Sequence, residues 1–198
     1  MLDMLLPLVV FAFVASVTPG PNNLLLLDSG VRFGFRRSLR HILGIQFGFA
    51  IQLALCAYGV GILLMNIPAA GWLLKLTGTT YLVYLAWNLR TTTMGQRSHG
   101  MEKPFSFLHA ALFQFVNPKA WIMTITAGSL FIPQLDSRMA SIALLCLVFG
   151  VVGAPSSGSW AVIGAVVRRY LADPFWQCCY SWTMIILTMY TAIAIWFF

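Results

Sequence analysis

The stretch FAFVASVTPGPNNLLLLDSG, residues 11–30, decides the fold of this chain. The sequence is apolar on both sides of TPGPNN, as in a membrane span of about 20 residues. Pro19 and Pro21 each remove a backbone donor and clash with the preceding turn, so the helix must break here. Hydrocarbon cannot satisfy the freed carbonyls, and the break must face protein or a water-filled cavity. One proline would indicate a simple kink, whereas two prolines, Gly20 and two asparagines together favour a functional break.

The composition of the whole chain is typical of an integral membrane protein. Of 198 residues, 60% are hydrophobic and 9% are charged, against roughly 45–50% and 25% in a soluble domain. Too few polar residues are left to build a water-exposed surface. The formal net charge of +7 comes from short basic clusters between apolar runs, which indicate membrane topology and not a nucleic-acid partner.

The apolar runs predict an all-α membrane protein, a single transmembrane domain of residues 1–198 with six transmembrane helices. The predicted spans lie near residues 4–27, 42–65, 70–90, 106–131, 139–166 and 177–198. Short stretches connect them, at residues 32–40, 66–68, 91–104, 133–138 and 168–174. MLDML at the start carries Asp3 and no basic residue, so we expect the first apolar segment to remain as a span and not to be a cleaved signal.

The basic residues predict the orientation of these spans. The odd-numbered connections hold nine Lys and Arg residues and the even-numbered ones hold two, which places the odd connections in the cytoplasm and both termini outside. The polar stretch 91–104 divides the chain into halves, residues 1–95 and 101–198, with three spans each. Because three is odd, the halves must insert in opposite directions, which is the inverted repeat common in secondary transporters.

A matching break occurs in the first span of the second half, at QFVNPK, residues 114–119. A lysine at this depth costs roughly 2.5–3.5 kcal/mol on insertion scales. Lys119 should therefore face the bundle interior and pair with a carbonyl, a carboxylate or a substrate anion; snorkelling to an interface is the alternative. Inverted symmetry would bring both breaks together near the midplane. Unwound carbonyls can hold an ammonium group there, while helix N-termini and Lys119 favour a carboxylate, so a zwitterionic amino acid would fit.

Several stretches of the chain resemble the LysE/RhtB family of amino-acid exporters: TPGPNNLLLL at 18–27 with GVRFGFRRSL after it, TGTTYLVYLAW at 77–87, and QFVNPKAW at 114–121. The resemblance covers the whole chain and weakens from about residue 135. It implies a carrier of the bacterial inner membrane that exports amino acids or close derivatives, by proton exchange and without an ATP-binding module. No cofactor and no catalytic residue are implied.

The expected substrate contacts are Asn22, Asn23, Asn117 and Lys119, with Gln114 lining the same cavity one turn before Asn117. The residues expected to shape the backbone are Thr18, Pro19, Gly20, Pro21 and Pro118. Asp28 departs from the family pattern and is either a proton-coupling carboxylate or the ion-pair partner of Arg32 one turn on.

Polar and small residues elsewhere have simpler expected roles. We expect Gln46 and Gln52 to form hydrogen bonds between helices, and Gly44 and Gly48 to allow close helix packing. His41, beside Arg40, should be solvated. Pro155 is either a hinge or a kink.

Two other classes of function compete with export. Cys56, Cys146, Cys178 and Cys179 lie in or beside apolar stretches, and a membrane thiol carrier would pass electrons through them. They form no CxxC pair and have no histidine at metal-ligand spacing, so we expect no metal site and no disulfide framework. The second competitor is a membrane scaffold without transport, which would not need Lys119 and two matching breaks. The sequence leaves open the substrate, the coupling ion and whether a homo-oligomer forms.

Overall fold

The chain is entirely helical wherever its regular structure is described. The computed structural model describes residues 2–90, 104–132 and 135–197, and no strand occurs in these ranges. This confirms the all-α prediction. The polar stretch 91–103, with Arg97, His99 and Lys103, lies outside the described residues.

The helices follow the predicted spans in order. In the first half they are α1 (Leu2–Val17), α2 (Pro21–Phe33), α3 (Phe35–Ala57), α4 (Val60–Met65) and α5 (Pro68–Arg90). In the second half they are α6 (Phe107–Phe113), the 3-10 turn η1 (Gln114–Val116), α7 (Pro118–Leu130), α8 (Arg138–Val167), α9 (Pro174–Ala194) and the 3-10 turn η2 (Ile195–Phe197).

Three helices are long and apolar enough to cross a membrane unaided: α3, α8, and α9 with η2. Helices α1 and α2 qualify together as one broken span, with a bend of 55° between them. Within the described ranges these give three spans, or four with the bent pair. The chain is therefore a multi-pass helical protein, and the six crossings stay a prediction.

Two glycines place helix boundaries that the apolar pattern predicts wrongly. Residues 32–40 were expected to connect spans, but they belong to helices, because α2 and α3 are separated only by Gly34 with φ of 80°. The basic residues of this stretch thus extend the two helices. At the other end of α3, Gly59 with φ of 105° ends the helix earlier than the predicted limit of residue 65. Such positive φ values suit glycine, which has no Cβ.

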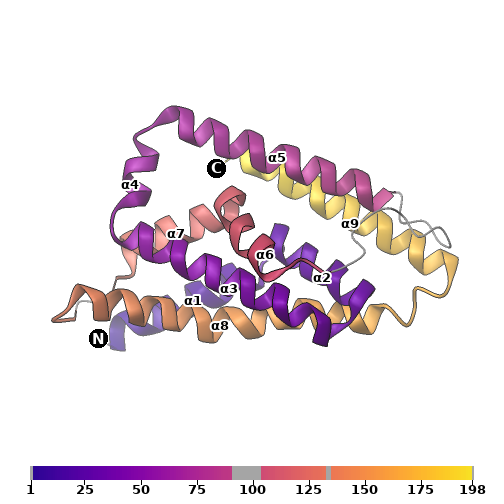
Figure 1. Ribbon diagram of the computed structural model, residues 1–198, viewed down its shortest axis with the longest axis horizontal. Coiled ribbons are helices and arrows are strands. Elements are labelled where there is room, and N and C mark those ends of the chain that lie inside the picture. The colour runs from indigo at the N-terminus through magenta and orange to yellow at the C-terminus, as the bar shows by residue number, and fades with distance from the viewer. Residues whose placement is uncertain (1, 91–103, 133–134, 198) are drawn as a thin grey trace.

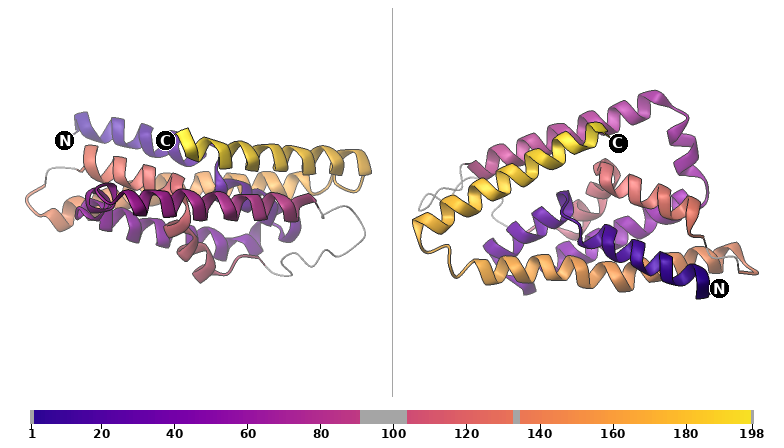
Figure 2. Two further views of the ribbon diagram at one scale, coloured as in Figure 1. Left: turned by 90° about the horizontal axis from the view of Figure 1, so that it is seen from above. Right: turned by 180° about the vertical axis from the view of Figure 1, so that it is seen from behind.

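The helices form a bundle with one separate pair beside it. Figure 1 shows α5 and α9 running antiparallel along one side, joined to the bundle through α4. In the bundle the broken helix α1–α2 packs mainly on α8, whereas the broken segment α6–η1–α7 packs on α3. The right-hand view of Figure 2, from behind, also shows α5 and α9 side by side along one edge of the bundle. Each broken helix thus packs extensively on a long helix of the other half of the chain, α8 or α3.

Small residues allow the closest of these helix contacts. A Cβ added at Gly44 or Gly48 would lie 2.3 Å from a backbone oxygen of α6, which confirms the predicted close packing. A Cβ at Gly30 would lie 2.1 Å from the Ala161 oxygen, and one at Gly164 would lie 2.1 Å from the Leu27 oxygen. Helices α2 and α8 are therefore in backbone contact along this stretch.

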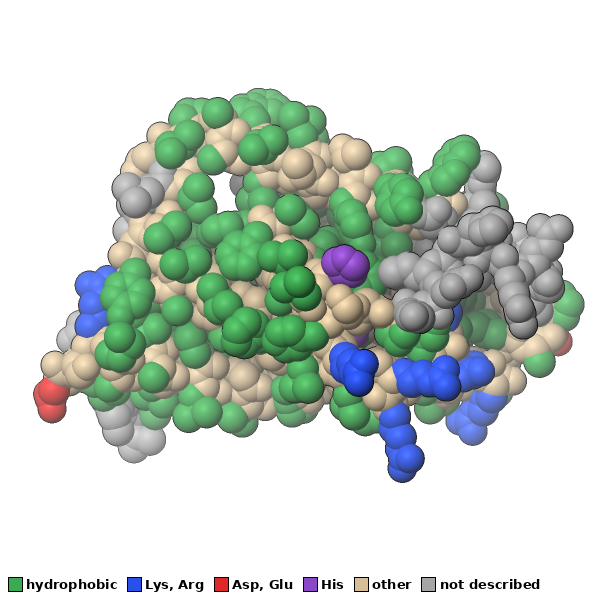
Figure 3. Space-filling view, viewed as in Figure 1, with side chains coloured by type: hydrophobic (Ala, Val, Ile, Leu, Met, Phe, Trp, Pro, Cys, Tyr) green, Lys and Arg blue, Asp and Glu red, His purple; other side chains and the backbone are tan. Residues whose placement is uncertain are grey.

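The outer surface of α3 shows why the bundle needs lipid. Five large apolar side chains are exposed at intervals of four residues, which places them on one helix face: Leu39, Leu43, Phe47, Ile51 and Leu55. In Figure 3 the visible face is largely hydrophobic, and Lys and Arg gather at its lower right, over the N-terminal end of α3. A face this apolar is typical of membrane-embedded protein.

The prediction for His41 is wrong. Its side chain is only 1% exposed and stacks on Phe105 with ring centroids 5.1 Å apart. It is buried because α3 begins at Phe35, so residue 41 already lies within the helix. Its ring faces Phe105, in the segment that precedes α6. Arg40, its neighbour, points to the exposed side.

Candidate functional site at the two helix breaks

The first break lies between Val17 and Pro21. Thr18, Pro19 and Gly20 are not helical, and α2 restarts with Pro21 in its first position, where a missing N–H does no harm. Asn23 supports the break from inside α2, because its side-chain amide donates to the carbonyl oxygens of Ser16 and Thr18, each at 2.8 Å. Two carbonyls at the break thus receive donors from the protein, as a membrane interior requires.

The second break is built in the same way. After the 3-10 turn η1, Asn117 caps the restarting helix α7, with its side-chain oxygen accepting from the backbone N–H of Lys119 at 3.1 Å. Pro118 occupies the first helical position. The indole of Trp121 donates to the Phe115 carbonyl at 2.9 Å, so this break also satisfies its own backbone.

The two breaks meet, as the sequence predicts. The Lys119 ammonium donates to the Thr18 carbonyl at 2.6 Å and to the Pro19 carbonyl at 3.4 Å. The side-chain amides of Asn22 and Gln114 bond each other twice, at 2.8 and 3.2 Å. One charge-assisted contact and one reciprocal amide pair therefore join the breaks.

Glycines let the breaks approach this closely. A Cβ at Gly20 would lie 2.6 Å from Cδ of Lys119, so a larger residue here would force the lysine side chain to shift. A Cβ at Gly78, on α5, would lie 2.6 Å from Cγ of Pro118. Sequence reasoning missed Gly78, although it lies in the TGTTYLVYLAW stretch, because nothing in its neighbourhood indicates which helix it contacts.

A cavity of about 50 Å³ lies at this junction, which is room for a few water-sized groups. Of the predicted residues, Gly20, Asn22, Asn23, Asn117 and Lys119 line it. Gln114 is fully buried behind Asn22 and does not line the cavity. Whether any of these residues contacts a substrate stays a prediction.

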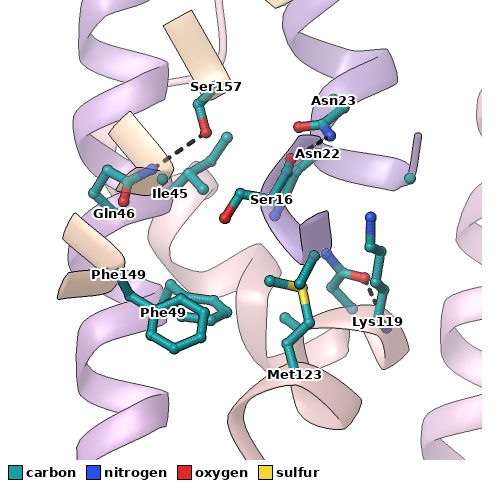
Figure 4. A pocket seen from close by; sticks show the side chains of 15 residues that line it. Ser16, Asn22, Asn23, Ile45, Gln46, Phe49, Lys119, Met123, Phe149 and Ser157 are labelled. Carbon is teal, nitrogen blue, oxygen red and sulfur yellow. Dashed lines mark hydrogen bonds between the residues drawn. The ribbon is translucent and has the colours of Figure 1, made fainter. Parts of the chain in front are cut away.

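Helices α1, α3 and α8 complete the cavity wall with residues that sequence reasoning did not assign to the site. They include Ser16, Gln46, Phe49, Phe149, Gly153 and Ser157. Figure 4 shows Gln46 and Ser157 on the opposite side of the pocket from Lys119. Gln46 donates to the Ser157 hydroxyl at 3.2 Å, which confirms its predicted hydrogen bond between helices. The same prediction is wrong for Gln52, whose buried amide has no partner in the described part of the chain.

Lys119 is the only charged residue among those that line the cavity. The N-terminal ends of α2 and α7, which carry partial positive charge, also meet here. Against these stand the carbonyl oxygens of Thr18 and Pro19. The junction of the two breaks thus holds positive groups and carbonyl oxygens side by side, next to the cavity.

Asp28 lies apart from the cavity lining. Its carboxylate forms an ion pair with Nε of Arg32 at 2.8 Å and accepts from the Tyr180 hydroxyl at 3.4 Å. The structure therefore contains the ion pair that was one of the two expected roles. Pro155 lies inside α8, which is continuous from Arg138 to Val167.

The chain is similar to a known family of transporters. The profile of the LysE type translocator family matches residues 13–198. The cysteine/O-acetylserine efflux protein of Escherichia coli (strain K12) is 34% identical over 161 residues, which cover 80% of this chain and 81% of that protein. The protein of the same name from Shigella sonnei (strain Ss046) has the same identity and coverage. No solved structure matches the chain.

Proposed function

Because the chain belongs to the LysE type translocator family, we propose that it is a secondary transporter that exports amino acids or close derivatives across the bacterial inner membrane. Translocators move solutes and are not enzymes, so no covalent step is needed. The observation that carries the proposal is the junction of two broken helices, held by Lys119 and the Asn22–Gln114 pair beside a cavity inside the bundle.

A zwitterionic substrate matches the charges at this junction. Its ammonium group can take the place of the Lys119 ammonium at the carbonyl oxygens of Thr18 and Pro19. Lys119, once released, and the N-termini of α2 and α7 can then hold the substrate carboxylate. Substrate binding thus replaces one internal contact by two contacts of matched charge.

The relatives suggest the first compounds to test. Two proteins of 34% identity carry the name cysteine/O-acetylserine efflux protein. Cysteine and O-acetylserine are small and zwitterionic at the backbone end, and a cavity of about 50 Å³ excludes bulky side chains unless the helices move. We therefore place small amino acids first among the candidate substrates.

Transport would proceed by alternating access with six spans in two inverted halves, both termini lying in the periplasm. Two features support this. The broken helix α1–α2 packs on α8, and the broken segment α6–η1–α7 packs on α3. Two inverted repeats that exchange equivalent contacts would pack in this way. Phe49 and Phe149 line the cavity and belong to an apolar core cluster, and α2 and α8 are in backbone contact. Rocking one half against the other would change access to the cavity from each side of the membrane in turn.

Protons are the proposed counter-ion, and Asp28 is the carboxylate that the sequence offers for coupling. Its ion pair with Arg32 supports the structural role instead, so another group would carry the coupled proton.

Reconstituted protein tests the proposal. Proteoliposomes would be loaded with labelled cysteine, O-acetylserine, serine and a panel of other amino acids, and efflux followed with and without a pH gradient. We expect efflux of at least one small amino acid, faster with the gradient than without. No efflux of any compound would favour the scaffold. Loss of activity when all four cysteines are replaced by serine would favour the thiol carrier; none of the four lines the cavity.

A further inference from the structure

The cavity has a second polar end, away from Lys119. Three polar side chains meet there from three helices: Ser16 at the end of α1, Gln46 on α3 and Ser157 on α8. A Cβ added at Gly153 would lie 3.1 Å from Oε1 of Gln46 and 3.5 Å from Oγ of Ser16, so the glycine leaves these groups room to converge. In Figure 4 Ser16 projects into the space between Lys119 and the Gln46–Ser157 pair.

These groups keep hydrogen-bonding capacity that the protein does not use. Gln46 donates to the Ser157 hydroxyl, but its Oε1 accepts no hydrogen bond from the described part of the chain. The hydroxyls of Ser16 and Ser157 likewise donate to no acceptor within the described ranges. Unused donors and acceptors are costly in a membrane interior unless water or a ligand satisfies them.

The apolar wall beside this end limits what can satisfy them. Phe49 and Phe149 pack with ring centroids 5.3 Å apart, and both line the cavity together with Met123. None of the lining residues at this end carries a charge. A charged side chain placed here would lose its hydration without gaining a counter-charge.

We propose that Gln46, Ser157 and Ser16 form the subsite for the substrate side chain, and that this subsite selects small, uncharged side chains carrying a hydrogen-bonding oxygen over apolar ones of the same size. The inference rests on the proposed function, because it takes the backbone end of an amino acid to bind at the helix breaks. Gln46 and Ser157 are then specificity residues.

Serine and alanine are the sharpest pair of probes, since they differ only in one hydroxyl. Proteoliposomes containing the full chain would be loaded with both, each carrying a different label, and the serine-to-alanine efflux ratio measured. The wild-type protein should prefer serine. Gln46→Met and Ser157→Ala should each lower the ratio by about 3- to 10-fold, the effect of losing one hydrogen bond to an uncharged group.

Two neighbours serve as matched controls. Gln52 lies on the same helix as Gln46 but does not line the cavity, and Ser156 precedes Ser157 and donates to the Val152 carbonyl. Gln52→Met and Ser156→Ala should leave the ratio unchanged. Gln46→Met and Ser157→Ala each test the subsite separately. If one variant fails to fold, the efflux ratio of the other still tests the proposal.

The outcomes separate this inference from the proposed function. A wild-type protein that exports both compounds equally, or test variants that export with an unchanged ratio, would overturn the subsite and leave amino-acid export standing. A wild-type protein that exports no amino acid would overturn the proposed function, and the subsite with it. A lowered ratio in the test variants alone supports both.

Discussion

The ammonium nitrogen of Lys119 lies 2.6 Å from the carbonyl oxygen of Thr18, although the two residues are 101 positions apart in the chain. Each belongs to a helix break, and the contact joins the broken helix α1–α2 to the broken segment α6–η1–α7. A lysine inside an apolar bundle is expensive unless it is paired. Here its partner is a carbonyl oxygen of the non-helical residues between α1 and α2.

Replacing Lys119 should stop export without removing the protein from the membrane. Lys119→Ala loses a charge-assisted hydrogen bond and the proposed carboxylate partner, so we expect efflux to fall by at least about tenfold. Immunoblots of isolated membranes should show unchanged abundance. Lys75→Ala, which removes a lysine of α5 outside the cavity, is the matched control and should export normally. Full transport by Lys119→Ala would remove the lysine from the site.

Exchanging the two residues of the Asn22–Gln114 pair tests whether their hydrogen-bonded amides are needed for export. Asn22→Ala leaves the fully buried amide of Gln114 without its reciprocal partner, at a cost of about 1–3 kcal/mol, and should abolish efflux. The double variant Asn22→Gln with Gln114→Asn keeps both amides and their combined length. We expect it to recover a substantial part of the efflux rate in proteoliposomes. An exchange variant as inactive as Asn22→Ala would mean that the pair does not act as a unit.

Asp28→Asn should weaken the fold while leaving proton coupling intact. Its carboxylate pairs with Arg32 and accepts from Tyr180, so the change removes the charge of this ion pair and weakens both contacts. We expect a lower melting temperature in detergent, together with the wild-type ratio of efflux with and without a pH gradient. Arg32→Gln, which removes the other half of the pair, should behave alike. A loss of gradient dependence confined to Asp28→Asn would instead make this carboxylate the coupling group.

The contact of α2 with α8 predicts a stability difference between two glycines of one helix. A Cβ at Gly164 would lie 2.1 Å from the Leu27 carbonyl oxygen, whereas a Cβ at Gly150 would meet nothing within 4 Å. Gly164→Ala should therefore destabilise the protein by about 1–3 kcal/mol through overpacking, seen as a lower melting temperature. Gly150→Ala should be neutral or slightly stabilising. Equal melting temperatures would show that α2 and α8 can separate freely.

The breaks could be predicted from the sequence because they interrupt the apolar runs that indicate membrane-spanning helices. Prolines and asparagines inside an apolar run cannot continue a helix in lipid, and Lys119 at the same depth needs a partner. Their meeting was predicted from the inverted arrangement that we expect for the two halves. The role of Asn23 is more specific than expected, since it donates to two carbonyls of its own break.

The opposite wall of the cavity could not be predicted, because it depends on how α3 and α8 are rotated. Gln46 and Gln52 are equally plausible from the sequence, yet one lines the cavity and the other is enclosed without a partner. The close approach of α6 at Gly44 and Gly48 fixes that rotation. Gly34 and Gly59 end helices for conformational reasons that an apolar pattern does not contain.

Protection of a thiol on the cavity wall tests most directly whether an amino acid binds in the cavity beside the two breaks. Ser16→Cys places a thiol on the cavity wall, in a chain whose Cys56, Cys146 and Cys179 are replaced by serine. Cys178, exposed on α9 and away from the cavity, is kept as an internal control. Both thiols would be labelled with N-ethylmaleimide, and their rates followed by mass spectrometry with and without serine. We predict that serine slows labelling at position 16 and leaves Cys178 unchanged. Equal rates at position 16 with and without serine, in a protein that exports serine, would contradict the account.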